Sequence, residues 1–163
     1  MSRGLGDVYK RQLVDVYKGT GSKDSWEKIT LASTIGGMVI NTTGVTLAHG
    51  MEHPASGLKD VVHGKGLAAL TPTIIEDSYQ GAPEKFAKLA KLFGGEKAED
   101  LAGKVRELLE DIELTCTLSD LGIEEKDIPW MAENCMKVSA HSIANNPVVF
   151  SQEEIAEIYK KAL

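Results

Sequence analysis

The spacing of hydrophobic residues constrains this sequence most, because they recur every three or four positions and rarely alternate with polar residues. Phe86, Leu89, Ala90 and Phe93, for example, stand at i, i+3, i+4 and i+7. That spacing places apolar side chains on one face of a helix, whereas a half-buried strand needs strict alternation. We count about six helical segments and no convincing strand. The sequence therefore predicts an all-α fold that resembles a helical bundle.

Capping and breaking residues predict where the first helices begin and end. Asp24, with a glutamate three residues later, indicates the start of a helix that runs toward His49. This helix is rich in small and apolar residues, so we expect it to be the central buried helix. Pro54 disfavours helical geometry at the residue before it. We therefore expect the helix to end near His53 and residues 55–63 to form a loop.

Similar signals mark the later helices. A helix is expected over 64–79, bent or broken at Pro72. Pro83 suits the first turn of the next helix, which Gly94 is placed to end. The remaining expectations are an amphipathic helix over 101–112, a turn over 119–123, a helix over 129–145, and a last helix capped by Ser151 and Glu154.

Size and charge narrow the class of protein. The chain has 163 residues and a mass of 17.6 kDa, enough for one domain with a real core. Its 18 basic and 24 acidic side chains give a net charge of −6, which argues against nucleic acid as a partner. Two cysteines outside any CxxC pair favour a reduced, cytoplasmic chain without a zinc ribbon.

One uncharged stretch, from Ile29 to Ala48, is long enough to raise the question of a membrane span. It contains many hydroxyl and amide side chains and three glycines. That polarity suits a helix buried in protein better than one surrounded by lipid. We therefore expect no membrane association.

The first residues have the character of an added leader. Residues 7–10 (DVYK) recur once as 15–18, and 4–12 resembles an adaptor-derived sequence found at the start of translated library fragments. We therefore expect residues 1–12 to be non-native and residues 13–163 to form the helical domain. A frayed native terminus is the alternative. A foreign leader would make this chain a fragment of a longer protein.

Three of the four histidines, His49, His53 and His63, lie within fifteen residues. A neutral imidazole is the commonest metal ligand. His49 and His53 would share one helix face and could chelate a divalent metal, with Glu52 or Asp60 as an extra ligand or base. The alternative is that these histidines merely bond backbone carbonyls at a helix end and in a loop. Their clustering beside a glycine-rich apolar helix favours a site.

A longer pattern surrounds these histidines. It reads Asn41-x-x-Gly44-x-x-x-Ala48-His49-Gly50-Met51-x-His53-Pro54, followed by His63-Gly64, and it continues through 67–72, 90–94, 121–123 and 146–147. This pattern resembles the iron-containing (group III) alcohol dehydrogenase family over nearly the whole chain. The resemblance implies the helical C-terminal domain of the iron-containing alcohol dehydrogenase/dehydroquinate synthase-like fold. In that fold the helical domain follows an N-terminal Rossmann-like domain, which we expect to be missing here.

The resemblance also implies roles for the histidines. His49 and His63 match the family's two late metal ligands, and the metal is Fe(II) or, alternatively, zinc. His53 matches the histidine that lies near the nicotinamide and is linked to proton movement, which makes it the catalytic and cofactor-binding residue. This reading replaces the HxxxH chelate by a pair fourteen positions apart. The family's other two ligands, an aspartate and a histidine, and its glycine-rich pyrophosphate loop lie far upstream and have no counterpart in this sequence.

The implied chemistry is hydride transfer between NAD(P) and a small-molecule alcohol or aldehyde, with the metal acting as a Lewis acid. Because half of the ligand set is missing, we expect the chain itself to be inactive and to bind metal poorly. Relatives of this kind imply a homo-oligomeric full-length parent. Val148 stands where many relatives carry an arginine after Asn-Pro, which puts any role of that arginine in doubt.

Two other readings of the histidine cluster remain open from the residues alone. The first is a small helical metalloprotein, such as a hydrolase, that uses His49, His53 and His63 together with Glu52 as a base. The second is a non-catalytic helical interaction module. We place His141 outside the site in every reading. Trp26 and Trp130 are expected to anchor the core.

Overall fold

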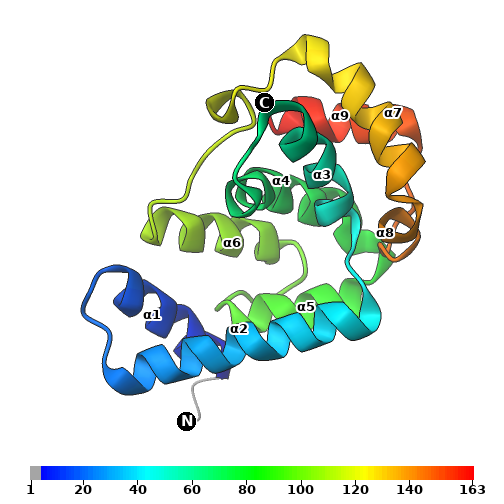
Figure 1. Cartoon of the computed structure of the whole chain (residues 1–163). Coiled ribbons are helices and arrows are strands. Elements are labelled where there is room, and N and C mark those ends of the chain that lie inside the picture. Colours follow the sequence, from blue (N-terminus) through cyan, green and yellow to red (C-terminus); the bar gives the residue numbers. More distant parts are fainter. Residues whose placement is uncertain (1–4) are drawn as a thin grey trace. The chain divides into compact units, whose positions relative to one another are not determined.

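A computed structural model describes residues 5–163, with side chains from residue 10 onward. Over these residues it contains helices and no strand, which confirms the predicted all-α class. The chain divides into two compact units, one formed by residues up to 44 with 83–113, the other by 45–82 with 114–163. The α-helices (Figure 1) are α1 (Leu5–Tyr17), α2 (Lys23–Thr43), α3 (Leu47–Lys59), α4 (His63–Ser78), α5 (Pro83–Leu92), α6 (Asp100–Asp111), α7 (Ile128–Val138), α8 (Ala140–Ala144) and α9 (Gln152–Lys161). Short 3₁₀ turns are η1 (Tyr79–Gly81), η2 (Ser119–Leu121) and η3 (Glu125–Asp127).

The first unit consists of α1, α2, α5 and α6. Helix α1 packs on α2 and contacts α5 and α6, and α5 and α6 pack against each other. Helix α2 begins two residues earlier than predicted, because the Ser22 hydroxyl, not Asp24, caps it by accepting the Ser25 backbone N–H at 3.1 Å.

The prediction that the helix after Asp24 is the central buried helix was wrong. In α2 only Ser25 is buried, and Met38 is 66% exposed. The helix also ends earlier than expected, at Thr43, where Gly44 adopts a φ of 73° and donates its N–H to the Ile40 carbonyl. The small and apolar composition that suggested burial therefore describes a largely exposed helix.

No single helix among the described residues is long and apolar enough to cross a membrane; only α2 and α3 taken together pass that test, judged by length and composition alone.

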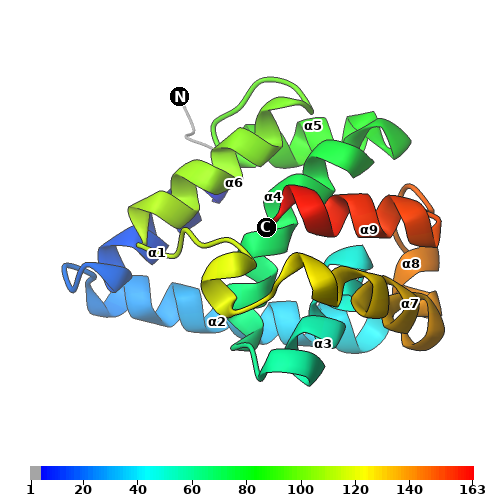
Figure 2. The same cartoon turned by 90° about the horizontal axis from the view of Figure 1, so that it is seen from above.

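The second unit holds most of the hydrophobic core. Helix α3 packs against α4, α7 and α8, while α9 packs against α4 and lies side by side with α7 (Figure 2). Leu47, Met51 and Ala55 of α3 are fully buried at i, i+4 and i+8, and Tyr159 of α9 is fully buried beside them in the same cluster. The core therefore centres on α3 rather than on α2.

The prediction that the helix ends at Pro54 was also wrong, because α3 continues through Pro54 to Lys59. A proline has no N–H to donate to the carbonyl four residues earlier, here that of Gly50. The Ser139 hydroxyl, at the junction of α7 and α8, donates to the Gly50 carbonyl at 3.2 Å instead. Helix–helix packing thus supplies the hydrogen bond that the proline removes, and the predicted loop 55–63 shrinks to residues 60–62.

Local signals located several other ends correctly. Helix α5 begins at Pro83, and Gly94 follows it with a φ of 83°. Ser151 and Glu154 form the predicted capping box of α9. The predicted helix 129–145 is instead two helices that break at Ser139.

Both tryptophans lie at the surface, so their prediction as core anchors was wrong. Trp26 is 56% exposed and Trp130 is 46% exposed. The acidic side chains at the end of α6 (Glu107, Glu110 and Asp111) are exposed, which is typical of a solvated helix face.

Candidate functional site

Three imidazoles converge where α3 meets the start of α4. His49 and His53 stand one turn apart on α3, and His63 is the first residue of α4. The ring centroids are 5.2 Å apart for His49 and His63, 5.9 Å for His53 and His63, and 6.4 Å for His49 and His53. The structure therefore brings together the three histidines that the sequence singled out.

These separations distinguish between possible ligand pairs. A metal about 2.1 Å from each ring nitrogen, at roughly tetrahedral angles, puts two coordinated imidazole centroids about 5 Å apart. The pair His49 and His63 has this separation, at 5.2 Å, whereas the HxxxH pair His49 and His53 is wider, at 6.4 Å. The pair fourteen positions apart thus has the geometry of a shared metal site more closely than the pair four apart.

A buried carboxylate lies beneath the histidines. Glu52 of α3 is fully buried, and its Oε2 pairs with Nδ1 of His63. Its Oε1 accepts a hydrogen bond from the Ser56 hydroxyl one turn later. Glu52, His53 and His63 also offer three ligand atoms that lie within 4.8 Å of one another, which defines a second possible donor group.

Burial keeps one imidazole uncharged. His49 is half-buried, and desolvation, followed by repulsion from His63 and His53, lowers its pKa below the ordinary value. The Glu52 carboxylate opposes this shift but is the weaker influence. A neutral imidazole has a free lone pair, so His49 is ready to bind a cation at neutral pH.

The other sequence candidates take less direct positions. Asp60 is exposed and ends α3 with a φ of 53°, in the left-handed conformation that aspartate tolerates, and it is not in the donor group. His141 is exposed in α8, with its ring 3.2 Å from the Asn145 side-chain nitrogen, and it is not in the donor group. Ser56 was missed, although its position four residues after Glu52 places both on one helix face.

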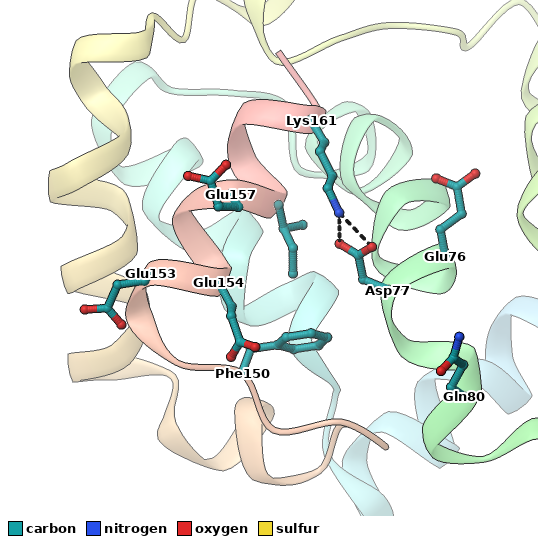
Figure 3. Close-up of a pocket in the computed structure, with 9 residues that line it drawn as sticks. Glu76, Asp77, Gln80, Phe150, Glu153, Glu154, Glu157 and Lys161 are labelled. Carbon is teal, nitrogen blue, oxygen red and sulfur yellow. Dashed lines mark hydrogen bonds and ion pairs between the residues drawn. The ribbon is translucent and has the colours of Figure 1, made fainter.

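A separate hollow of about 470 Å³ lies between α4 and α9 in the second unit (Figure 3). Five carboxylates and one lysine line it, and three of the carboxylates and the lysine already have structural roles. Asp77 pairs with Lys161 at 2.8 Å, Glu157 pairs with Lys160 at 2.6 Å, and Glu154 caps α9. The hollow contains none of the histidines, and we assign the candidate site to the histidine cluster.

Comparison with known proteins identifies the relationship that this geometry suggests. Residues 8–163 match the model of the C-terminal domain of the Fe-containing alcohol dehydrogenase family. The chain belongs to the iron-containing alcohol dehydrogenase family. This confirms the resemblance drawn from the histidine pattern and the predicted helical C-terminal domain.

Relatives within this family include named alcohol-processing enzymes. The 1,3-propanediol dehydrogenase of Klebsiella pneumoniae is 33% identical over 144 residues, which are 83% of this chain and 37% of that protein. The lactaldehyde reductase of Escherichia coli (strain K12) is 28% identical over 150 residues, which are 87% of this chain and 39% of that protein.

Solved structures agree with the family and the fold. A 1,3-propanediol oxidoreductase matches 98% of this chain and 45% of its own, with a TM-score of 0.81 and 31% identity. The alcohol dehydrogenase from Oenococcus oeni matches 97% of this chain and 43% of its own, with a TM-score of 0.84 and 25% identity. The chain spans less than half the length of these relatives.

Proposed function

We propose that this chain is the helical, metal-binding part of an alcohol dehydrogenase that transfers hydride between NAD(P) and a small-molecule alcohol or aldehyde. The observation that carries the proposal is the convergence of three imidazoles from α3 and α4 in a member of this family. The names of the relatives, a propanediol dehydrogenase and a lactaldehyde reductase, support this substrate class.

In this proposal His49 and His63 hold a divalent metal, Fe(II) or zinc. Their centroid separation of 5.2 Å and the lowered pKa of His49 support a shared cation, because both favour neutral nitrogen donors at metal-binding distance. When bound, the metal would supply Lewis-acid polarisation of the alcohol oxygen, and NAD(P) would supply the hydride acceptor. Two protein ligands fill only part of a coordination shell, so binding by this chain alone should be weak.

His53 is proposed as the catalytic residue beside the nicotinamide. Its ring is exposed and lies farther from His49 than His63 does, which leaves its nitrogens available to substrate and solvent. From this position the imidazole can accept the alcohol proton and release it to water.

The remaining expectations belong to the same proposal. Both cysteines are free, which supports a reducing, cytoplasmic location. The net charge of −6 argues against a nucleic-acid partner. The parent enzyme is expected to be a homo-oligomer, with no membrane partner.

The alternative of a hydrolase that uses Glu52 as a base has weaker support. One Glu52 oxygen is bonded to Ser56 and the other is paired with His63, and the side chain is fully buried. A general base needs an oxygen within reach of a water molecule. Family membership likewise favours the dehydrogenase.

Cobalt(II) titration of the purified chain, followed by its visible absorption, tests the ligand assignment. We expect weak binding that His49→Ala and His63→Ala abolish, while His53→Ala and the matched control His141→Ala leave it unchanged. Equal binding by the wild type and the His49→Ala and His63→Ala variants would contradict the assignment.

A chimera tests the activity. The part of the Klebsiella propanediol dehydrogenase that precedes its match would be joined to residues 13–163 of this chain. We expect NAD(P)-dependent alcohol oxidation by the chimera with added Fe(II), none by this chain alone, and a loss of turnover but not of metal in the His53→Ala chimera. Robust turnover by the isolated chain would refute its predicted inactivity.

A further inference from the structure

We propose that Glu52 is a positioning residue, which holds the Nδ1–H of His63 so that only its Nε2 is presented to the metal. Ser56 in turn fixes the carboxylate of Glu52. This inference rests on the proposed function, because it takes His63 to be a metal ligand.

The contacts of Glu52 assign a different task to each oxygen. Oε2 pairs with Nδ1 of His63, and Oε1 accepts from the Ser56 hydroxyl. A neutral imidazole carries its proton on one nitrogen and a lone pair on the other. If Nδ1–H donates to the carboxylate, the lone pair is on Nε2, which is the only ring nitrogen left to bind a cation. Carboxylate–histidine–metal arrangements of this kind orient the ligand ring and raise its basicity.

The burial of Glu52 argues that the carboxylate supports the site and is not itself a ligand. Its side chain is fully buried, whereas the side chain of His63 is 49% exposed. A buried carboxylate is stable only when its oxygens are hydrogen-bonded or paired, and both oxygens here have such partners. Direct ligation through Glu52 would have to use a remaining lone pair of an oxygen that is already hydrogen-bonded and fully buried.

Packing between α3 and α4 leaves little room for the carboxylate to move. A Cβ atom placed on Gly66 of α4 would lie 2.8 Å from Cγ and 3.0 Å from Oε1 of Glu52. The Glu52 side chain therefore occupies the space that a side chain at position 66 would need. Helix α4 carries both this glycine and His63, so the same element that admits the carboxylate also presents the ring to it.

Ser56 connects the carboxylate to the loop before His63. Its hydroxyl lies 2.9 Å from the carbonyl of Val61 and also bonds Glu52. Val61 is buried, and the next residue, Val62, is the N-cap of α4. Two features determine where the His63 ring points: the backbone that leads into His63 and the Glu52 carboxylate. Ser56 contacts both.

The tautomer of His63 tests the contact without any metal. Long-range proton–nitrogen NMR of histidine-labelled chain would be recorded at about pH 8.5, roughly two units above the ordinary histidine pKa of about 6.5. We expect Nδ1 of His63 to be protonated in the wild type and in Glu52→Gln, whose amide oxygen can accept the same hydrogen bond. Glu52→Ala should lose this preference. An Nε2–H tautomer in the wild type, or no change in Glu52→Ala, would overturn the proposal.

Metal affinity provides the second readout. In a cobalt(II) titration we expect Glu52→Ala to bind about 10- to 100-fold more weakly than the wild type, the range seen when supporting partners of ligands are removed. Glu52→Gln should retain most of the affinity. The matched control is Asp60→Asn, which removes an exposed carboxylate three residues before His63 and should change neither tautomer nor affinity.

The variants also separate the competing explanations. If Glu52 is a direct ligand, Glu52→Gln will lose as much affinity as Glu52→Ala, and the positioning role is wrong. If His63→Ala binds cobalt as tightly as the wild type, the proposed metal site fails, whatever tautomer is found. Circular dichroism of each variant checks its fold. If Glu52→Ala does not fold, Ser56→Ala replaces it as the test; this variant keeps the carboxylate and should weaken the preference for a proton on Nδ1 of His63.

Discussion

Helices α2 and α3 follow each other in the chain and are both rich in small and apolar residues, yet only α3 is buried. Met51 of α3 is fully buried, whereas Met38 of α2 is 66% exposed. The difference lies in their partners, because α3 packs against α4, α7 and α8, and α2 packs mainly against α1. Composition alone therefore did not determine which helix would carry the core and the site.

The glycines of the two helices show the same contrast. A Cβ on Gly50 of α3 would lie 3.1 Å from the Cβ atoms of both Ser139 and Ser142. A Cβ on Gly36 or Gly37 of α2 would meet nothing within 4 Å among the described residues. Small residues thus allow close helix packing in α3, while in α2 the space they leave is open.

The largest expected effect is the loss of folding stability when a methionine of each helix is replaced by alanine. Met51→Ala should lower the free energy of unfolding by about 2–5 kcal/mol, because it leaves a cavity in the packed core. Met38→Ala should change it by less than about 0.5 kcal/mol, since that side chain is mostly solvated. Urea denaturation of both variants measures the difference. Equal losses would show that α2 is as well packed as α3.

Replacing one glycine of α4 and one glycine of α2 by alanine should change the folding stability by smaller amounts and in opposite directions. Gly66→Ala should destabilise the chain by about 1–3 kcal/mol, because the new methyl group overlaps the buried Glu52 side chain. Gly37→Ala should stabilise it by about 1 kcal/mol, since alanine is the better helix former and the position is open. Thermal unfolding compares the two, and a stabilising Gly66→Ala would contradict the tight packing of Glu52.

The smallest expected effect on stability at neutral pH is that of the thiol of Cys135, which is fully buried in α7. Burial raises the pKa of its thiol from about 9 to about 12. The folded state therefore keeps the proton more tightly than the unfolded state does, and this contribution to stability is complete below pH 9 and lost as the pH rises through 12.

Thiol labelling tests the burial of Cys135 by comparing it with a cysteine introduced on the exposed helix α2. At about pH 8, near the reactive range of an ordinary thiol, Cys135 should react with a disulfide reagent only after unfolding. A cysteine introduced by Met38→Cys should react at once. Rapid labelling of Cys135 in the folded chain, or resistance of the Met38→Cys thiol, would reverse the contrast.

The parts of the fold that depend on neighbouring residues in sequence were predictable. Pro83, Gly94 and the pair Ser151–Glu154 each determine a helix end through their own backbone or side chain, and each was located correctly. Pro54 misled the prediction, because the Ser139 hydroxyl, distant in sequence, replaces the hydrogen bond that the proline removes.

The site was predictable to a similar extent. The cluster of His49, His53 and His63 could be read from spacing, and the structure brings the three rings together. The pairing of His63 with Glu52 could not, because it depends on the approach of α4 to α3 at Gly66. The assignment of ligand roles to these histidines stays a prediction.

The three-residue connection between α3 and α4 has a consequence for how this sequence can vary. The connection consists only of residues 60–62, and the Ser56 hydroxyl contacts the Val61 carbonyl within it. It therefore has little conformational freedom. Successive residues of a helix point about 100° apart around its axis. Moving the histidine one position along α4 would therefore turn its ring away from Glu52. The length of the connection sets the rotation of α4 relative to α3. We therefore expect insertions or deletions in residues 60–62 to be tolerated far less than substitutions there.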